Sequence, residues 1–132
     1  MSEKNSYRSI NNFLKFYDAY KWLNDIANLK ENWNSYGAHS FSSEHIEHVK
    51  SILHWLSFQN MKCPFVSPTG RDSIQIEWRV GESKHHAGEE KYLEIEVYAD
   101  GHIETFMTMD LDNVTIDDVA ELYHRWIEED DE

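Results

Sequence analysis

Residues 92–107, YLEIEVYADGHIETFM, decide the fold class of this chain. Leu93, Ile95 and Val97 before Asp100 and Gly101, and Ile103, Thr105 and Met107 after them, alternate with more polar residues. This period-two alternation is typical of antiparallel strands with one buried face and one solvated face. The stretch therefore predicts a β-hairpin, with its turn at the Asp-Gly pair.

The length of that turn determines which side chains face each other. A two-residue loop of Asp100 and Gly101 would place Val97 opposite Glu104, which mixes apolar and charged residues on one face. A three-residue loop over residues 99–101 pairs Val97 with Ile103 and keeps the apolar face continuous. We therefore predict the three-residue loop, with its glycine in the left-handed conformation.

Three helices are predicted around the strands. Apolar residues at three- and four-residue spacing favour a first helix over residues 9–29, and the breadth of this apolar stripe suggests that it is buried on more than one side. A second helix begins after Ser42 as its N-cap and ends near residues 58–60, and residues 32–40 between the two form a loop. A last helix begins after Thr115, with Asp118 three positions later in a capping-box arrangement.

A third strand is predicted over residues 74–80, where apolar and polar residues again alternate. Pro64 and Pro68 confine the preceding stretch to loop or edge conformations. The prediction is an α+β fold of order α-α-β-β-β-α, in which a three-stranded antiparallel meander carries helices on one face. The 132 residues form one domain, with a frayed N-terminus of about eight residues and an acidic tail over residues 128–132.

Negative charge is concentrated towards the C-terminus. The formal net charge is −13, and residues 100–132 hold 12 of the 25 acidic residues but only one basic residue, Arg125. Such a field repels nucleic acid and anionic lipid and attracts basic surfaces. Direct nucleic-acid binding is therefore not expected, because it needs clustered Lys and Arg.

Two groups of carboxylates are candidate partner-binding residues. The predicted register places Glu96 directly opposite Glu104 on the outward face, where like charges destabilise a sheet unless something compensates. Arg79 would neutralise part of this group. The outward-face candidates are Glu77, Glu94, Glu96 and Glu104, and the C-terminal candidates are Asp117, Asp118, Glu121 and Glu128. The alternative interpretation is a solvated face whose glutamates point separately into water.

No motif predicts a cofactor, a metal or a catalytic set. The sequence contains no HExxH or CxxC spacing and no phosphate-binding glycine loop. His45 and His48 are expected on the polar flank of the second helix. The single cysteine, Cys63, cannot form an internal disulfide, which fits a reducing compartment, and no signal peptide is apparent. We therefore expect a cytoplasmic protein.

Three segments carry a resemblance to known proteins: NWNSYGA at residues 32–38, PFVSPTGRDSIQIEW at residues 64–78 and YLEIEVYADGHIE at residues 92–104. In this order they resemble a group of small bacterial proteins of unassigned function, with the pattern NW(D/N)xYGA, IQ(L/I)EW and LEIE(I/V)xxDG. Asn34 and Ser35 stand where that group has Asp-Gly. The resemblance implies a product of bacterial chromosomes or mobile elements, in phage-conflict or toxin–antitoxin biology.

The function expected from these observations is a non-enzymatic, acidic protein-interaction domain that docks a basic surface. One form is a small inhibitor of the anti-CRISPR or anti-restriction kind, whose carboxylates imitate nucleic-acid phosphates. An antitoxin-like or oligomerising structural module, which could be a homo-oligomer, is an alternative. A metal-dependent enzyme that uses the outward-face carboxylates is another.

Overall fold

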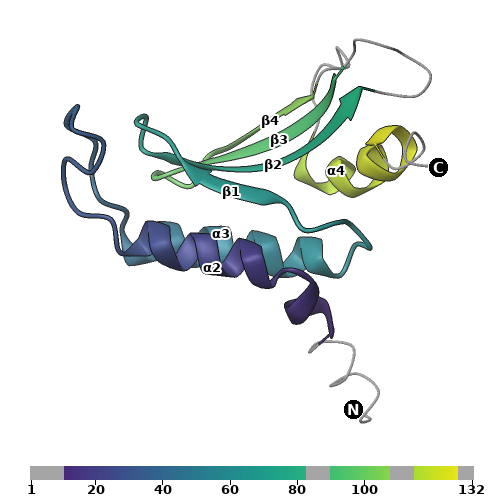
Figure 1. Ribbon diagram of the computed structural model, residues 1–132, viewed down its shortest axis with the longest axis horizontal. Coiled ribbons are helices and arrows are strands. Elements are labelled where there is room, and N and C mark those ends of the chain that lie inside the picture. The colour runs from purple at the N-terminus through teal and green to yellow at the C-terminus, as the bar shows by residue number, and fades with distance from the viewer. Residues whose placement is uncertain (1–10, 83–89, 108–114, 128–132) are drawn as a thin grey trace.

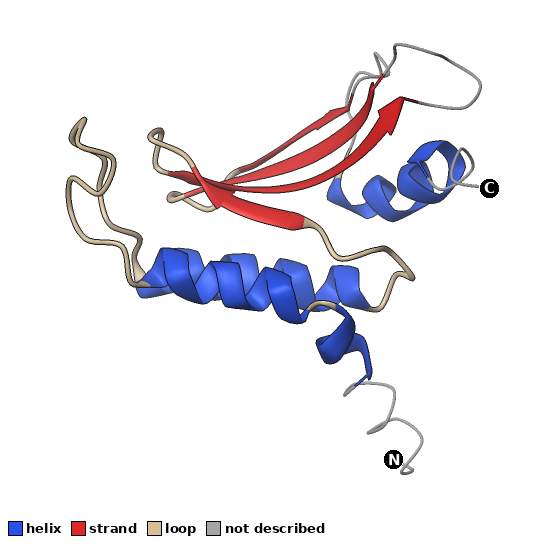
Figure 2. Ribbon diagram, viewed as in Figure 1, coloured by secondary structure: helices blue, strands red, loops and turns tan. Residues whose placement is uncertain are grey.

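Helices cover one face of a four-stranded antiparallel sheet, and no described helix lies over the other face (Figures 1 and 2). The structure is a computed structural model that describes residues 11–82, 90–107 and 115–127. Its element order confirms the predicted α+β class.

The sheet has the strand order β1-β2-β3-β4. Its strands are β1 (Phe65–Pro68), β2 (Ser73–Glu82), β3 (Glu90–Tyr98) and β4 (Ile103–Met107). The predicted hairpin register between β3 and β4 is confirmed, because Val97 pairs with Ile103 and Leu93 pairs with Met107. Gly101 has φ +94°, which is the left-handed conformation that the three-residue turn requires.

The prediction of three strands is wrong, because β1 adds a fourth. Phe65 pairs with Glu77 and Pro68 pairs with Ile74 on β2. Proline is compatible with this strand because β1 lies at the sheet edge, where one side of the backbone needs no ladder partner. The strand has only four residues, follows Pro64 and ends at Pro68, so it shows no alternation from which a strand could be predicted.

The first two helices run side by side beneath the sheet as α2 (Tyr17–Ala27) and α3 (Ser43–Ser57) (Figure 1). The predicted N-cap of α3 is confirmed, because the Ser42 hydroxyl accepts a hydrogen bond from the His45 N–H at 3.1 Å. The predicted continuous first helix is interrupted. A helical segment at residues 11–15 ends in a turn at Phe16, whose side chain is fully buried in the core.

The last helix begins as predicted, as α4 (Ile116–Leu122), and continues as the π-helical turn η1 (Tyr123–Ile127). The Asp118 carboxylate accepts hydrogen bonds from the Thr115 hydroxyl at 2.8 Å and N–H at 3.3 Å. The change to π geometry was not predicted. It lets two consecutive side chains bind the segment after α3: the Tyr123 hydroxyl accepts from the Lys62 N–H, and His124 bonds the Gln59 carbonyl.

The core lies between the sheet and the helices. Its sheet side consists of the inward residues of all four strands, and Phe16, Leu53, Val119 and Tyr123 approach from the helices. From the last helix, Val119 and Tyr123 are buried in this core; the side chains of Trp126 and Ile127 lie outside those described. This packing fixes which sheet face remains open.

The left-handed Gly101 gives a first test of the register. A Cβ at this position would meet no neighbouring atom, so the cost of Gly101→Ala is conformational. We expect the free energy of unfolding to fall by about 1–2 kcal/mol, measured by urea denaturation. Gly101→Asn should cost clearly less, since Asn tolerates the left-handed region; equal losses for the two variants would contradict the conformational explanation.

Candidate functional site

The open face of the sheet carries two pairs of directly opposed glutamates. Glu77 on β2 faces Glu94 on β3, and Glu96 on β3 faces Glu104 on β4. All four residues were predicted to share this face, and strand alternation places them there. The opposition of Glu96 to Glu104 is confirmed.

A tyrosine hydroxyl lies at the first pair. Tyr92 donates a hydrogen bond to the Glu94 carboxylate and also interacts with Glu77. Burial and these two carboxylates raise the pKa of Tyr92, so the phenol stays protonated as a donor. The Arg79 guanidinium lies 5.2 Å from the centre of the Tyr92 ring and 4.0 Å from the Glu77 carboxylate. The expected role of Arg79 in neutralising this group is consistent with that position.

Glu96, in the second pair, is buried although it lies on the open face: it is 5 % exposed. Its carboxylate accepts hydrogen bonds from Ser73 at 2.7 Å, from Arg71 at 3.1 and 3.3 Å, and from Gln75 at 3.3 Å. Burial alone would raise the pKa of Glu96, but these donors together with Tyr98 outweigh it and lower the pKa to about 2. Glu96 is therefore a fixed, ionised carboxylate.

Tyr98 separates Glu96 from its opposed partner. Its hydroxyl donates to Glu104 at 3.1 Å. Hydrogen bonding to Glu96, then burial, then hydrogen bonding to Glu104 raise the pKa of Tyr98 to about 12. Its ring stacks on His102 with 4.5 Å between centroids, and His102 lies 3.1 Å from the second oxygen of Glu104. The predicted conflict between Glu96 and Glu104 is thus relieved by a shared phenol and by separate donors.

Sequence reasoning missed Arg71 and the two tyrosine hydroxyls. Arg71 follows Gly70 in the turn between β1 and β2, so nothing local in the sequence links it to Glu96. The tyrosines gave a signal that was available: Tyr92 and Tyr98 alternate in phase with Glu94 and Glu96 and therefore share their face. Hydroxyl donors in phase with carboxylates indicate a hydrogen-bonded face instead of separately solvated acids.

Three chain segments lie at one end of the sheet, namely the loop of residues 32–40, the β1–β2 turn and the β3–β4 turn (Figure 1). A Cβ on Gly70 would lie 3.2 Å from the Asn34 side-chain nitrogen, so the turn after β1 contacts the loop of residues 32–40. The Ala99 N–H donates to the Asp72 carbonyl at 2.9 Å, which ties this turn to the β3–β4 turn. All three segments belong to the stretches on which the resemblance to small bacterial proteins rests.

The loop of residues 32–40 is held by its own side chains. The Asn34 side-chain oxygen Oδ1 accepts hydrogen bonds from the N–H groups of Tyr36 and Ala38, and the Asn32 Oδ1 accepts from the Gly37 N–H at 2.7 Å. Gly37 has a positive φ of 85°, and Asn32 and Ser35 also have positive φ. Tyr36, at the loop tip, is 91 % exposed.

The C-terminal carboxylates are not part of the open face. α4 packs against the covered side of the sheet, so Asp117, Asp118 and Glu121 are exposed on a different surface (Figure 1). Asp118 is occupied in capping, and Glu121 lies 3.6 Å from Arg125. Glu128, with the acidic tail, lies outside the described residues. The structure thus brings together one of the two predicted groups.

His45 is buried and bonds the Val97 carbonyl at 2.8 Å, so its placement on a polar helix flank is wrong; the residue joins α3 to β3. Burial raises the pKa of the half-buried Cys63 thiol. Within residues 11–82, 90–107 and 115–127, no three His, Cys, Asp or Glu side chains converge in a way that could hold a metal ion.

Comparison with known proteins finds no matching family model, no matching curated protein and no matching solved structure. None of the described helices has both the length and the apolar character needed to cross a membrane.

The buried carboxylate predicts a specific acid dependence of stability. The folded pKa of Glu96 lies near 2, below its ordinary value of 4.5, so its stabilising contribution is present above pH 4.5 and is lost as the pH falls towards 2. Glu96→Gln should lower the free energy of unfolding by about 1–3 kcal/mol at pH 7 and flatten its decline between pH 4.5 and 2. Urea denaturation at several pH values in this window measures both effects.

Asp25→Asn, at an exposed position of α2 remote from the open face, is the matched control for the loss of one charge. Ser73→Ala removes the shortest hydrogen bond to Glu96 and should shift the acid dependence in the same direction by a smaller amount. An unchanged slope in Glu96→Gln would refute the assigned role of this carboxylate.

Proposed function

We propose that this protein is a non-enzymatic interaction domain that binds a basic segment of a partner protein on the open face of its sheet. The observation that carries the proposal is the pair of opposed glutamate pairs, held in place by tyrosine hydroxyls on a face that no described element covers. Such carboxylates are acceptors already fixed for Lys or Arg donors.

The charge of this face favours a basic partner. Its described side chains include four glutamates, and the arginines that approach them are Arg71 and Arg79. The excess of carboxylates supplies complementarity, which accelerates association and selects partners more than it adds affinity. A nucleic-acid-binding protein, whose phosphate-binding surface is basic, is one partner class of this chemistry, and an inhibitor would occupy that surface. A basic toxin is another.

The arrangement of apolar residues sharpens the partner's chemistry. One cross-strand row runs Phe65, Glu77, Glu94, Phe106 over all four strands. The two phenylalanines at its ends are 48 % and 56 % exposed. The row therefore suits a segment in which basic residues are flanked by apolar or aromatic ones, since exposed aromatic groups supply the buried contact area of interfaces.

The test is an amide NMR titration of the full chain with a synthetic peptide that alternates arginine and leucine. We expect the largest shifts at Glu94, Glu104 and Phe106, and we expect affinity to fall as salt is raised. The double variant Glu94→Lys/Glu104→Lys should abolish the shifts. The matched control Asp117→Lys/Glu121→Lys, with the same charge change on α4, should retain them.

Shifts centred on α4, or an equal loss in both double variants, would show attraction by net charge alone and would overturn the proposal. A circular dichroism spectrum of each variant controls for folding.

A further inference from the structure

Five exposed large apolar side chains lie on the layer that residues 11–62 form around α2 and α3, called the helical layer, on the opposite side of the molecule from the open sheet face. Phe13, Leu14 and Tyr17 belong to the apolar stripe of the predicted first helix, and the expectation that this stripe is buried is wrong for these three residues. The exposed fractions are 48 % for Phe13, 60 % for Leu14, 53 % for Tyr17, 37 % for Trp55 and 36 % for Phe58. All five lie near the start of α2 or the end of α3, and these ends are neighbours because the two helices are antiparallel (Figure 1).

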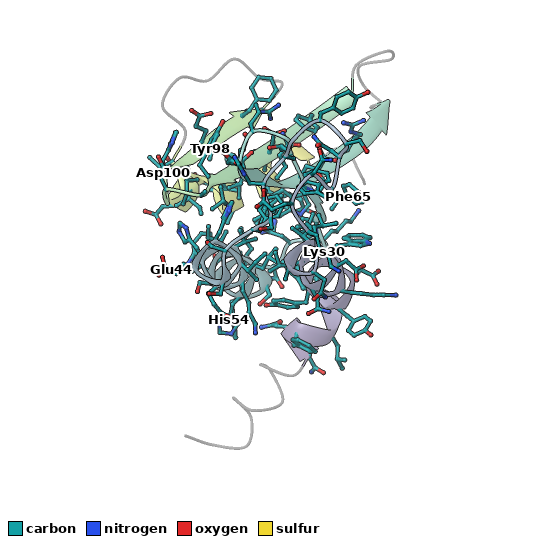
Figure 3. The ribbon with its side chains drawn as sticks, turned by 90° about the vertical axis from the view of Figure 1, so that its left-hand side faces the viewer. Lys30, Glu44, His54, Phe65, Tyr98 and Asp100 are labelled. Atoms are coloured by element: carbon teal, nitrogen blue, oxygen red, sulfur yellow. The ribbon has the colours of Figure 1, made fainter. Side chains whose placement is uncertain are left out.

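One of them, Phe13, lines a groove between the two helices. Its wider part has a volume of about 360 Å³ and is lined by Phe13, Tyr20, Glu47, Lys50, Ser51 and His54. A second part of about 250 Å³ shares four of these residues and extends along α2 to Ala27. His54 lies beneath the helices, away from the sheet (Figure 3).

Aromatic contacts shape the groove walls. Phe13 stacks on Tyr20 with 5.1 Å between centroids, and His54 meets Phe58 edge to face at 5.2 Å. Glu47, Ser51, His54 and Phe58 follow one another at helical spacing along the outward side of α3. Exposed aromatic side chains beside a groove are typical of an interaction site.

The charge of the helical layer identifies its occupant. Residues 11–62 contain five acidic and five basic residues, whereas residues 63–132 contain 19 acidic and five basic ones. Two copies of this chain repel each other strongly through the sheet and the C-terminal region. Approach through the helical layer brings neutral surfaces together. A strongly acidic or basic partner would gain nothing from that neutrality.

The groove is also self-complementary. Glu47 and Lys50 line both of its parts and lie about one helical turn apart. When two α3 helices cross antiparallel about a two-fold axis between these positions, Glu47 of each copy meets Lys50 of the other. We infer that the α2–α3 groove is a homodimer interface whose occupant is the same groove of a second copy. This inference is independent of the function proposed for the open face.

Sedimentation equilibrium of the full chain over a range of concentrations tests it. The mass should rise from 15.7 kDa towards twice that value. Glu47→Lys and Lys50→Glu should each weaken association roughly fivefold to tenfold, because each creates two like-charge contacts in the dimer. An equimolar mixture of the two variants should regain wild-type affinity, because its mixed dimer contains only opposite-charge contacts.

That recovery is specific to two copies meeting in this way. Ser51→Arg inserts a large charged side chain into the groove at an exposed helix position and should reduce association at least as much. A wild-type chain that remains monomeric, a mixture that associates no better than either variant, or a Ser51→Arg chain that associates normally would each overturn the inference. In those cases residues 1–10 or a different protein would be the candidate occupant.

Discussion

The structure depends on one carboxylate that is buried on the wrong side of a sheet. Glu96 points away from the hydrophobic core, yet it is almost inaccessible because Arg71, Ser73, Gln75 and Tyr98 enclose it. Breaking such a group's contacts is costly, since a buried charge without its donors has no water to replace them. Through Arg71 the same carboxylate fixes the β1–β2 turn, which in turn contacts the loop of residues 32–40.

This constraint also organises the remaining charges of the open face. Because Arg71, Ser73 and Gln75 already donate to Glu96, the Tyr98 hydroxyl can donate its hydrogen bond to Glu104. In the other pair, strand pairing brings Glu77 and Glu94 together at the Tyr92 hydroxyl. Each tyrosine lies in the strand that supplies one glutamate of its pair. In each pair a tyrosine hydroxyl forms hydrogen bonds with the opposed glutamates. These bonds explain how a strand register that places like charges opposite each other is stable.

The register of residues 92–107 could be predicted from the sequence alone, because alternation and turn length are local properties. Only the three-residue turn keeps the apolar face of this hairpin continuous. The same reasoning placed Glu96 opposite Glu104 and the α3 and α4 caps where they lie. It failed for β1, because a strand of four residues that follows Pro64 and ends at Pro68 shows no alternation. It also failed for Arg71, because its hydrogen-bond partner Glu96 is 25 residues away in the sequence. It also failed for Phe13, Leu14 and Tyr17, because helical periodicity shows that residues share a face but not whether that face is covered.

The open sheet face and the α2–α3 groove lie on opposite layers of the molecule. A dimer formed through the helical layer would leave both open sheet faces outward, related by the two-fold axis. Neither surface would compete with the other for area, and the acidic faces would be kept apart. Such a dimer would offer two equivalent acidic platforms, and a partner with two basic segments would gain from effective concentration instead of from any stronger single contact. The division of charge between a neutral helical layer and an acidic sheet layer suits this arrangement, since each layer then has the electrostatics of its own partner.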